Sequence, residues 1–183
     1  MFSDGKGGTI TQDKITDNEK FYTDPAPNFT YGFGSTFNYA NFSLNFFLRG
    51  THGEKVFNNT RLILDNIKRL PGNNVTKEAL TNGINDAAVA SDLWLENASF
   101  LRLDNTSLSY DFKNVKGFEN LRVYISANNL FVITKYKGLD PEINTSNTNL
   151  NTANLAYIDA NYNGNGYYPK TRSFTFGVNL TIK

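Results

Sequence analysis

The sequence predicts an all-β fold in which about five antiparallel strands are joined alternately by short turns and long connections. Apolar and polar residues alternate with a period of two along five stretches, the pattern of strands with one apolar and one polar face. All five prolines lie outside the cores of these stretches, where a missing N–H would interrupt the hydrogen-bond ladder. No run approaches the roughly 18 consecutive apolar residues of a membrane-spanning helix, so helical spanning is excluded.

A polar, turn-rich segment over residues 1–28 precedes the first two strands, which we expect over 29–39 and 42–50. Ala40 and Asn41 are just long enough for a tight turn, so the two strands should form a hairpin. The alternating apolar positions are Phe29, Tyr31, Phe33, Phe37 and Tyr39 in the first strand, and Phe42, Leu44, Phe46 and Leu48 in the second.

The first long connection spans residues 51–98, where the alternation stops. Apolar residues at helical spacing predict a short helix over 60–70, with Thr60 as its N-cap and Pro71-Gly72 after its end. One or two further helical turns are expected over 76–89, although Gly83 weakens that pattern.

Alternation returns in the last three strands, expected over 99–112, 119–136 and 170–183. A short turn at 113–117 joins the first two of them. The second long connection, over 137–168, is rich in Asn, Thr and Gly and has no sustained period. One face of the final strand is entirely apolar and consists of Phe174, Phe176, Val178, Leu180 and Ile182.

Charge and the rare residue types restrict the function. The chain carries 18 Lys and Arg against 17 Asp and Glu, a net charge of +1, which provides no basic field for nucleic acid. It has no Cys, which removes thiol nucleophiles and Cys-ligated metal sites, and its single His, His52, makes a His-based metal site or a Ser-His-Asp triad very hard to assemble. We therefore expect no enzyme, no cofactor or metal, and no nucleic-acid partner.

Two environments suit the apolar strand faces: a second sheet, in a soluble β-sandwich that binds glycans, or lipid. The opposite faces carry mainly Ser, Thr, Asn and Gly rather than the Lys and Glu of a solvated sheet, which resembles a crowded polar lumen. Short and long connections alternate as in outer-membrane barrels, and about ten tilted residues span the ~25 Å lipid-facing band of such barrels. The pattern favours lipid and leaves the sandwich as the alternative.

Five strands are too few to close a barrel, because the smallest bacterial barrels have about 8. Residues 1–6 are not followed by an apolar stretch and so do not read as a secretory signal. Both observations predict that the chain is a piece of a larger barrel.

Four stretches stand out along the chain: NFTYGFG at 28–34; WLENASFLRLDN at 94–105, continuing to Tyr110; NNLF at 128–131 with TKYKGLDPE at 134–142; and YPKTRSF at 168–174, continuing to the end. In the same order, they resemble segments of the SusC/RagA family of TonB-dependent outer-membrane transporters of Bacteroidetes. Together they span most of the chain. The resemblance places the chain at the C-terminal end of a 22-stranded barrel.

The resemblance implies uptake of oligosaccharides or peptides across the cell outer membrane. A SusD-like surface lipoprotein would form a lid over the connections 51–98 and 137–168, which would be extracellular, and energy would come from the TonB complex. The family's plug domain, TonB-contacting segment and signal peptide lie upstream of the matched region, so this chain by itself would not gate or couple transport.

Two departures from the family pattern bear on sites. Residues 4–13 keep the shape of a calcium-binding loop but have lost most of its acidic ligands, so we expect no metal there. The final residue is Lys183, where such barrels commonly end in an aromatic. Phe174 and Phe176 are then left to carry the signal that the assembly machinery would read in this lipid-facing strand.

Four residues are candidates for contact with a transported solute. Arg49 and Arg122 have the parity of the polar face, where they would pair with acidic neighbours or touch an oligosaccharide. Trp94 and Tyr162 lie in the connections and would either stack on sugar rings or, as we favour, pack. The pair in Asp140-Pro141-Glu142 suits a turn rather than catalysis, because no nucleophile lies nearby.

Overall fold

The computed structural model describes the backbone of residues 2–3 and 9–10 and all of residues 24–85, 87, 89–143, 157–159 and 168–182. The chain divides into two compact units, which are described separately. The sheet unit comprises Asn28–His52, Ser99–Thr134 and Lys170–Lys183. The loop unit comprises Met1–Pro27, Gly53–Ala98 and Lys135–Pro169.

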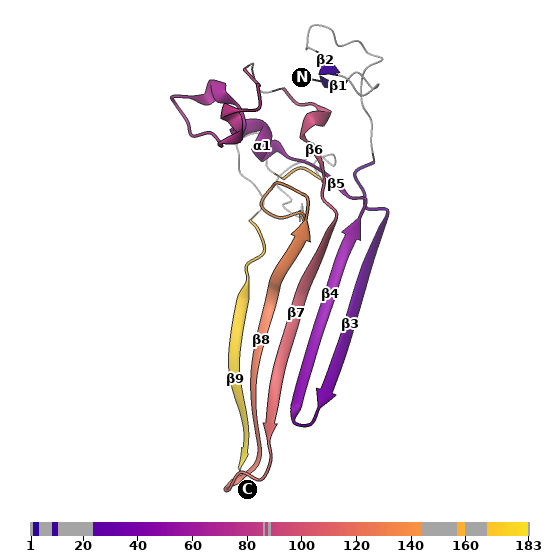
Figure 1. The fold of residues 1–183 in the computed structure, drawn as a ribbon, viewed down its shortest axis with the longest axis vertical. Coiled ribbons are helices and arrows are strands. Elements are labelled where there is room, and N and C mark those ends of the chain that lie inside the picture. The colour runs from indigo at the N-terminus through magenta and orange to yellow at the C-terminus, as the bar shows by residue number, and fades with distance from the viewer. Residues whose placement is uncertain are drawn as a thin grey trace, which may run out of the picture. The chain divides into compact units, whose positions relative to one another are not determined.

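The sheet unit is one antiparallel sheet of five strands in the order β3-β4-β7-β8-β9 (Figure 1). This confirms the predicted fold class. The strands are β3 (Phe29–Tyr39), β4 (Phe42–His52), β7 (Phe100–Phe112), β8 (Phe118–Thr134) and β9 (Ser173–Ile182).

Short turns join the strands at one end of the sheet, and the long connections leave from the other end. Ala40, in the turn between β3 and β4, has φ 53°, and Asn114 and Gly117 in the turn between β7 and β8 have φ 58° and 89°. A positive φ costs Ala more than Asn or Gly, which shows that the hairpin geometry overrides the local preference of Ala40.

A β-bulge divides β7 into two parts of opposite parity. Leu103 lies opposite Leu48 and Asn105 opposite Phe47, so Asp104 is an extra residue in the ladder between β4 and β7. The bulge keeps leucine facing leucine on one face although the sequence parity changes at this point.

All elements in the described part of the loop unit are short. The strands β1 (Phe2–Ser3) and β2 (Thr9–Ile10) pair with each other, as do β5 (Lys55–Phe57) and β6 (Leu95–Asn97). The helices are α1 (Asn59–Leu64) and the 3₁₀ helices η3 (Ile67–Arg69), η4 (Glu78–Leu80) and η5 (Asp92–Trp94). Within the part of the chain that the structure describes, none of the helices has the length and apolar character that a membrane crossing requires.

The helix expected over 60–70 begins earlier and is shorter. Asn58 caps α1 in place of Thr60, because its side-chain oxygen accepts a hydrogen bond from the Arg61 N–H at 2.9 Å. The α-helix ends at Leu64 and the chain continues as η3. In the described part of 76–89, the only helical segment is η4, which ends before Gly83 at φ 72°.

Strand ends also differ from expectation. Strand β4 continues through His52, which is therefore a strand residue whose ring stacks on Phe29 at 5.1 Å between centroids. Strand β8 ends at Thr134, two residues early, because Tyr136 belongs to the core of the loop unit. Strand β9 begins at Ser173 rather than 170, and Lys183 lies outside the described residues.

Gly50 permits the close approach of β4 to its neighbours, and this predicts a stability difference. A Cβ at Gly50 would overlap the carbonyl oxygen of Phe100 and lie 2.6 Å from Cζ of Tyr31. We expect Gly50→Ala to lower the free energy of unfolding by about 1–3 kcal/mol, because backbone atoms must move. The midpoint of denaturant-induced unfolding measures this effect.

Gly32→Ala is the matched control for that substitution. A Cβ at Gly32 would lie 3.1 Å from Cζ of Phe47, a side chain that can shift. A loss for Gly32→Ala as large as that for Gly50→Ala would contradict the assignment of Gly50 as the tighter position.

Candidate functional site

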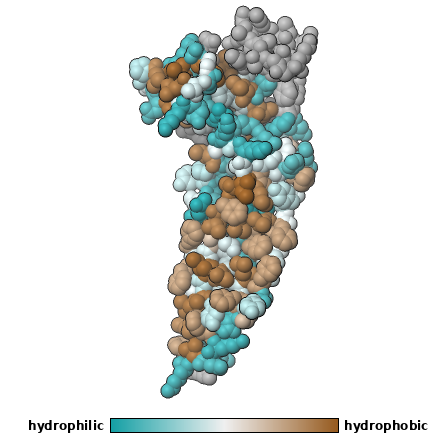
Figure 2. All heavy atoms as spheres, in the orientation of Figure 1, coloured by the Kyte–Doolittle hydropathy of each residue, from teal (hydrophilic) through white to brown (hydrophobic). Residues whose placement is uncertain are grey.

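The strand register gathers the apolar residues of all five strands on one face of the sheet. One row across the sheet illustrates this: Phe37, Leu44, Leu108, Ile125 and Phe176 are successive cross-strand partners. Because side chains at paired positions point to the same side, the whole row lies on one face, which we call the apolar face. Figure 2 shows hydrophobic side chains gathered over the strands, with hydrophilic ones at the lower tip.

The apolar face is uncovered within the sheet unit. Phe33 is 59% exposed, and in β9 the exposure runs from 48% at Val178 to 75% at Ile182. The other two sheets of the described residues have only two and three residues per strand, too short for the second layer of a sandwich. Such a continuous apolar surface exceeds what soluble monomers expose, so the β-sandwich alternative is not supported. The expected lipid-facing residues of β9 all lie on this face: Phe174, Phe176, Val178, Leu180 and Ile182.

Aromatic rings gather near both ends of the apolar face. At the turn end, Tyr110 makes edge contacts with Phe42 and Phe112, with ring centroids 4.6 and 4.7 Å apart. At the other end, Phe29 stacks on His52. Amphipathic or polarisable rings at two levels are the arrangement found at the two interfaces of a transmembrane barrel.

Charges on the opposite, polar face are arranged in pairs. Arg49 forms an ion pair with Asp104 at 3.1 Å across β4 and β7. Arg122 binds Asp111 through two hydrogen bonds of 2.5 and 2.9 Å across β7 and β8. Both arginines, predicted as contacts for a solute, thus have an acidic partner, and the bidentate geometry fixes the orientation of Arg122.

Arg102 is the most buried charged residue of the sheet unit among those described, and no pattern in the sequence indicates this burial. Its side chain is 1% exposed, with its guanidinium 5.4 Å from the ring centroid of Phe100 and hydrogen-bonded to the Asn129 side chain. Asn129, at φ 52°, also donates a hydrogen bond to the carbonyl oxygen of Lys170 at 2.8 Å. The pair of Arg102 and Asn129 therefore connects β7 and β8 to the start of β9.

Two aromatic rings on the polar face lie flat over glycines of the neighbouring strand. A Cβ at Gly32 or Gly34 would come within 3.1 Å of the ring of Phe47. A Cβ at Gly177 would overlap the ring of Tyr124. The contact is tightest at Gly177, where a larger residue would force the Tyr124 ring to move, whereas at Gly32 and Gly34 a small shift of Phe47 would suffice.

The loop unit has a small apolar core around Tyr136. Val56, Ala98 and Tyr136 are buried together, and Ile143 packs against them. Burial raises the pKa of the Tyr136 hydroxyl above its ordinary value, and the negative charge of Asp159 raises it further. Tyr136 stays a neutral side chain at physiological pH.

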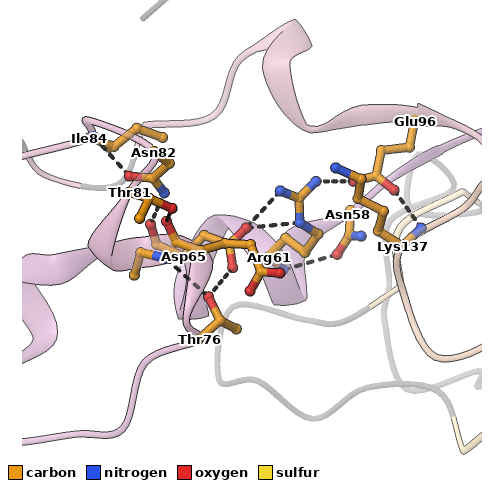
Figure 3. Close-up of polar contacts among 11 residues, drawn as sticks. Asn58, Arg61, Asp65, Thr76, Thr81, Asn82, Ile84, Glu96 and Lys137 are labelled. Carbon is orange, nitrogen blue, oxygen red and sulfur yellow. Dashed lines mark hydrogen bonds and ion pairs between the residues drawn. The ribbon is translucent and has the colours of Figure 1, made fainter.

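Arg61 is the centre of a polar network in the loop unit (Figure 3). Its guanidinium binds Asp65 at 2.7 Å and Glu96, and the other oxygen of Glu96 accepts the backbone N–H of Lys137 at 2.8 Å. Burial by itself would lower the pKa of Arg61, but the hydrogen bonds and charges of Glu96 and Asp65 outweigh it and raise the pKa. Asp65 also accepts a hydrogen bond from the Thr76 hydroxyl.

The connections hold the remaining candidates. Trp94 is only 5% exposed, and Cζ of Arg61 lies 5.6 Å from the centroid of its ring. This burial favours a packing role for Trp94 over stacking on a sugar. Tyr162 lies outside the described residues, as do residues 4–8 and 11–13 of the expected non-binding calcium-like loop. The side chain of Asp140 accepts the N–H of Glu142 at 2.9 Å, the geometry of a turn.

Sequence comparisons find no matching family model. The chain is 31% identical over 190 residues to TonB-dependent receptor P3 of Formosa agariphila, covering 97% of this chain and 18% of the relative. It is 34% identical over 194 residues to TonB-dependent receptor SusC of Bacteroides thetaiotaomicron, covering 98% of this chain and 17% of the relative. The chain thus spans less than a fifth of the length of these curated relatives.

Solved structures show the same fold. The RagAB peptide importer in the open-open state matches 99% of this chain and 20% of its own, with a TM-score of 0.70 and 23% identity. The RagAB peptide transporter matches 93% and 19%, with a TM-score of 0.66 and 24% identity. All these relatives are named as receptors, importers or transporters and not as enzymes, which agrees with the expectation that the chain is no enzyme. In sequence the chain is similar to a segment of TonB-dependent receptors, SusC among them, and it shares the fold of the corresponding part of the RagAB transporter.

Proposed function

We propose that the chain forms the C-terminal strands of a TonB-dependent transporter in the outer membrane of a Bacteroidetes-like bacterium. The observation that supports this most directly is the uncovered apolar face, which carries no Lys, Arg, Asp or Glu at its paired strand positions. In water such a face costs free energy, whereas against hydrocarbon it needs no second layer.

The two open edges of the sheet fit the same proposal. Within the described residues, β3 and β9 each pair on one side only. Unpaired N–H and C=O groups cannot remain in hydrocarbon, so further strands of the same barrel would pair with both edges. The chain would then contribute five strands to a larger wall, with its plug domain elsewhere in the receptor.

The polar face would line the interior of the barrel. The connections expected over 51–98 and 137–168, which correspond to Gly53–Ala98 and Lys135–Pro169 of the loop unit, would be extracellular. The transported solute would be an oligosaccharide or a peptide; of the relatives, the RagAB importer is named for peptides. A SusD-like lipoprotein would cover the extracellular side, and the TonB complex would supply energy through regions outside this chain.

The lipid-facing assignment of β9 predicts opposite outcomes for neighbouring residues. Phe176 lies on the apolar face and Thr175 on the polar face. In the intact receptor, Phe176→Arg should lower the free energy of unfolding from lipid vesicles by about 2–4 kcal/mol, because the charge enters hydrocarbon. Thr175→Arg is the matched control and should have a much smaller effect. Equal losses in urea titrations of vesicle-bound receptor would count against the assignment.

The alternation along β7 predicts which positions meet lipid and which meet water. Ser107 lies on the polar face and Leu108 on the apolar face. A nitroxide attached to Cys at 108 should collide with dissolved oxygen more than with a water-soluble nickel chelate, because oxygen concentrates in hydrocarbon. A nitroxide at 107 should show the reverse ratio or be immobilised. The same oxygen preference at both positions would argue that β7 does not separate lipid from lumen.

Transport itself is testable in cells that express the intact receptor and its lipoprotein partner. Uptake of a labelled oligosaccharide or peptide mixture should require the receptor and should stop when the proton-motive force is dissipated, because TonB-dependent transport uses that energy. In a receptor that carries Arg61→Gln but keeps the wild-type strands, membrane insertion and solute uptake are measured as separate quantities. Uptake that persists without the proton-motive force would refute the proposed energy source.

A further inference from the structure

A three-residue segment of the second connection binds the beginning of α1 in the first. Phe57 and Ile158 form an isolated parallel bridge, with the Phe57 N–H donating to the carbonyl oxygen of Tyr157 at 2.8 Å. The carboxylate of Asp159 accepts the backbone N–H groups of Asn59 at 2.7 Å and Thr60 at 3.1 Å. The first turn of α1 therefore takes its cap from a residue about 100 positions away in sequence as well as from Asn58.

Glu96 provides a second link between the two connections, and Arg61 holds Glu96 in position (Figure 3). Arg61 holds Glu96 by an ion pair, and Glu96 holds the backbone N–H of Lys137 in the second connection. Arg61 also neutralises Asp65, whose side chain is buried. Removing the guanidinium would leave these carboxylates without their shared cation, so the link depends on one residue.

Burial makes both links costly to break. Asp159 is 8% exposed, and water reaches its carboxylate poorly if the N–H groups of α1 move away. The shared core also holds the two connections together, because Val56 and Ala98 of the first connection pack with Tyr136 of the second. Displacement of either connection alone would break the core, the cap and the ion pairs together.

We propose that Arg61 and Asp159 are positioning residues that make the two long connections move as one body. The inference rests on the proposed function, in which these connections lie on the extracellular side of a transporter. A partner that displaces the described part of one connection then displaces that of the other, so the two respond in one step rather than one after the other. The coupling is reciprocal, since both connections share the same contacts.

Hydrogen exchange of the intact receptor in detergent, followed by mass spectrometry, tests the coupling. Asp159→Ala alters the second connection and should speed exchange of backbone amides over 57–62 at least roughly tenfold, the effect of losing a strong cap. Arg61→Gln alters the first connection and should speed exchange over 136–143. Both variants should therefore loosen both connections.

The matched control is Glu78→Ala, an exposed acidic residue of the first connection, which should leave exchange unchanged over both segments. If Asp159→Ala fails to fold, Asp159→Asn keeps the shape and removes the charge, and a smaller increase over both segments is expected. Faster exchange confined to the connection that carries each substitution would overturn the proposal. The readout needs neither lipid nor solute, so a failure of the transport function would appear in uptake and not here.

Discussion

Hydrogen bonds between strands keep the alternation of side chains in phase across the sheet, and every other property of the sheet unit depends on this register. A slip of one residue in any strand would place its apolar residues on the polar face. The extra residue Asp104 acts in the opposite sense: it restores the phase where the parity of β7 changes, so that Leu103 still meets Leu48. The side-chain carboxylate of this extra residue forms an ion pair with Arg49.

The sheet was predictable from sequence because alternation is a local signal. Residues such as Phe29, Phe33 and Phe37 reveal a strand without reference to its partners. The bulge was not predictable, because a change of apolar parity within one strand cannot be distinguished from an irregular sequence until the pairing with the neighbouring strand is known. The same holds for Arg102, which looks like any strand arginine until Asn129 is placed beside it.

The loop unit was least predictable, and its contacts explain why. Three consecutive residues, Asn58, Asn59 and Thr60, are all suitable caps for a helix, and the sequence favoured Thr60. Asn58 takes the position because the N–H groups of Asn59 and Thr60 already bind Asp159 of the other connection. No local pattern encodes a partner so distant in sequence, and Trp94 likewise packs under Arg61 for reasons visible only in three dimensions.

The two units meet different physical demands. The sheet has many apolar residues and leaves them uncovered, so its stability needs an apolar surrounding phase. The apolar cluster around Tyr136 is small, and among the described residues it supplies little of the free energy needed to order long connections. Buried carboxylates with fixed partners make the structure of the loop unit specific instead. Each carboxylate is fully hydrogen-bonded and paired in one arrangement, whereas many other arrangements leave its charge unpaired. A unit held in this way tends to be either fully assembled or open, which is the behaviour expected of segments that must change position as a whole.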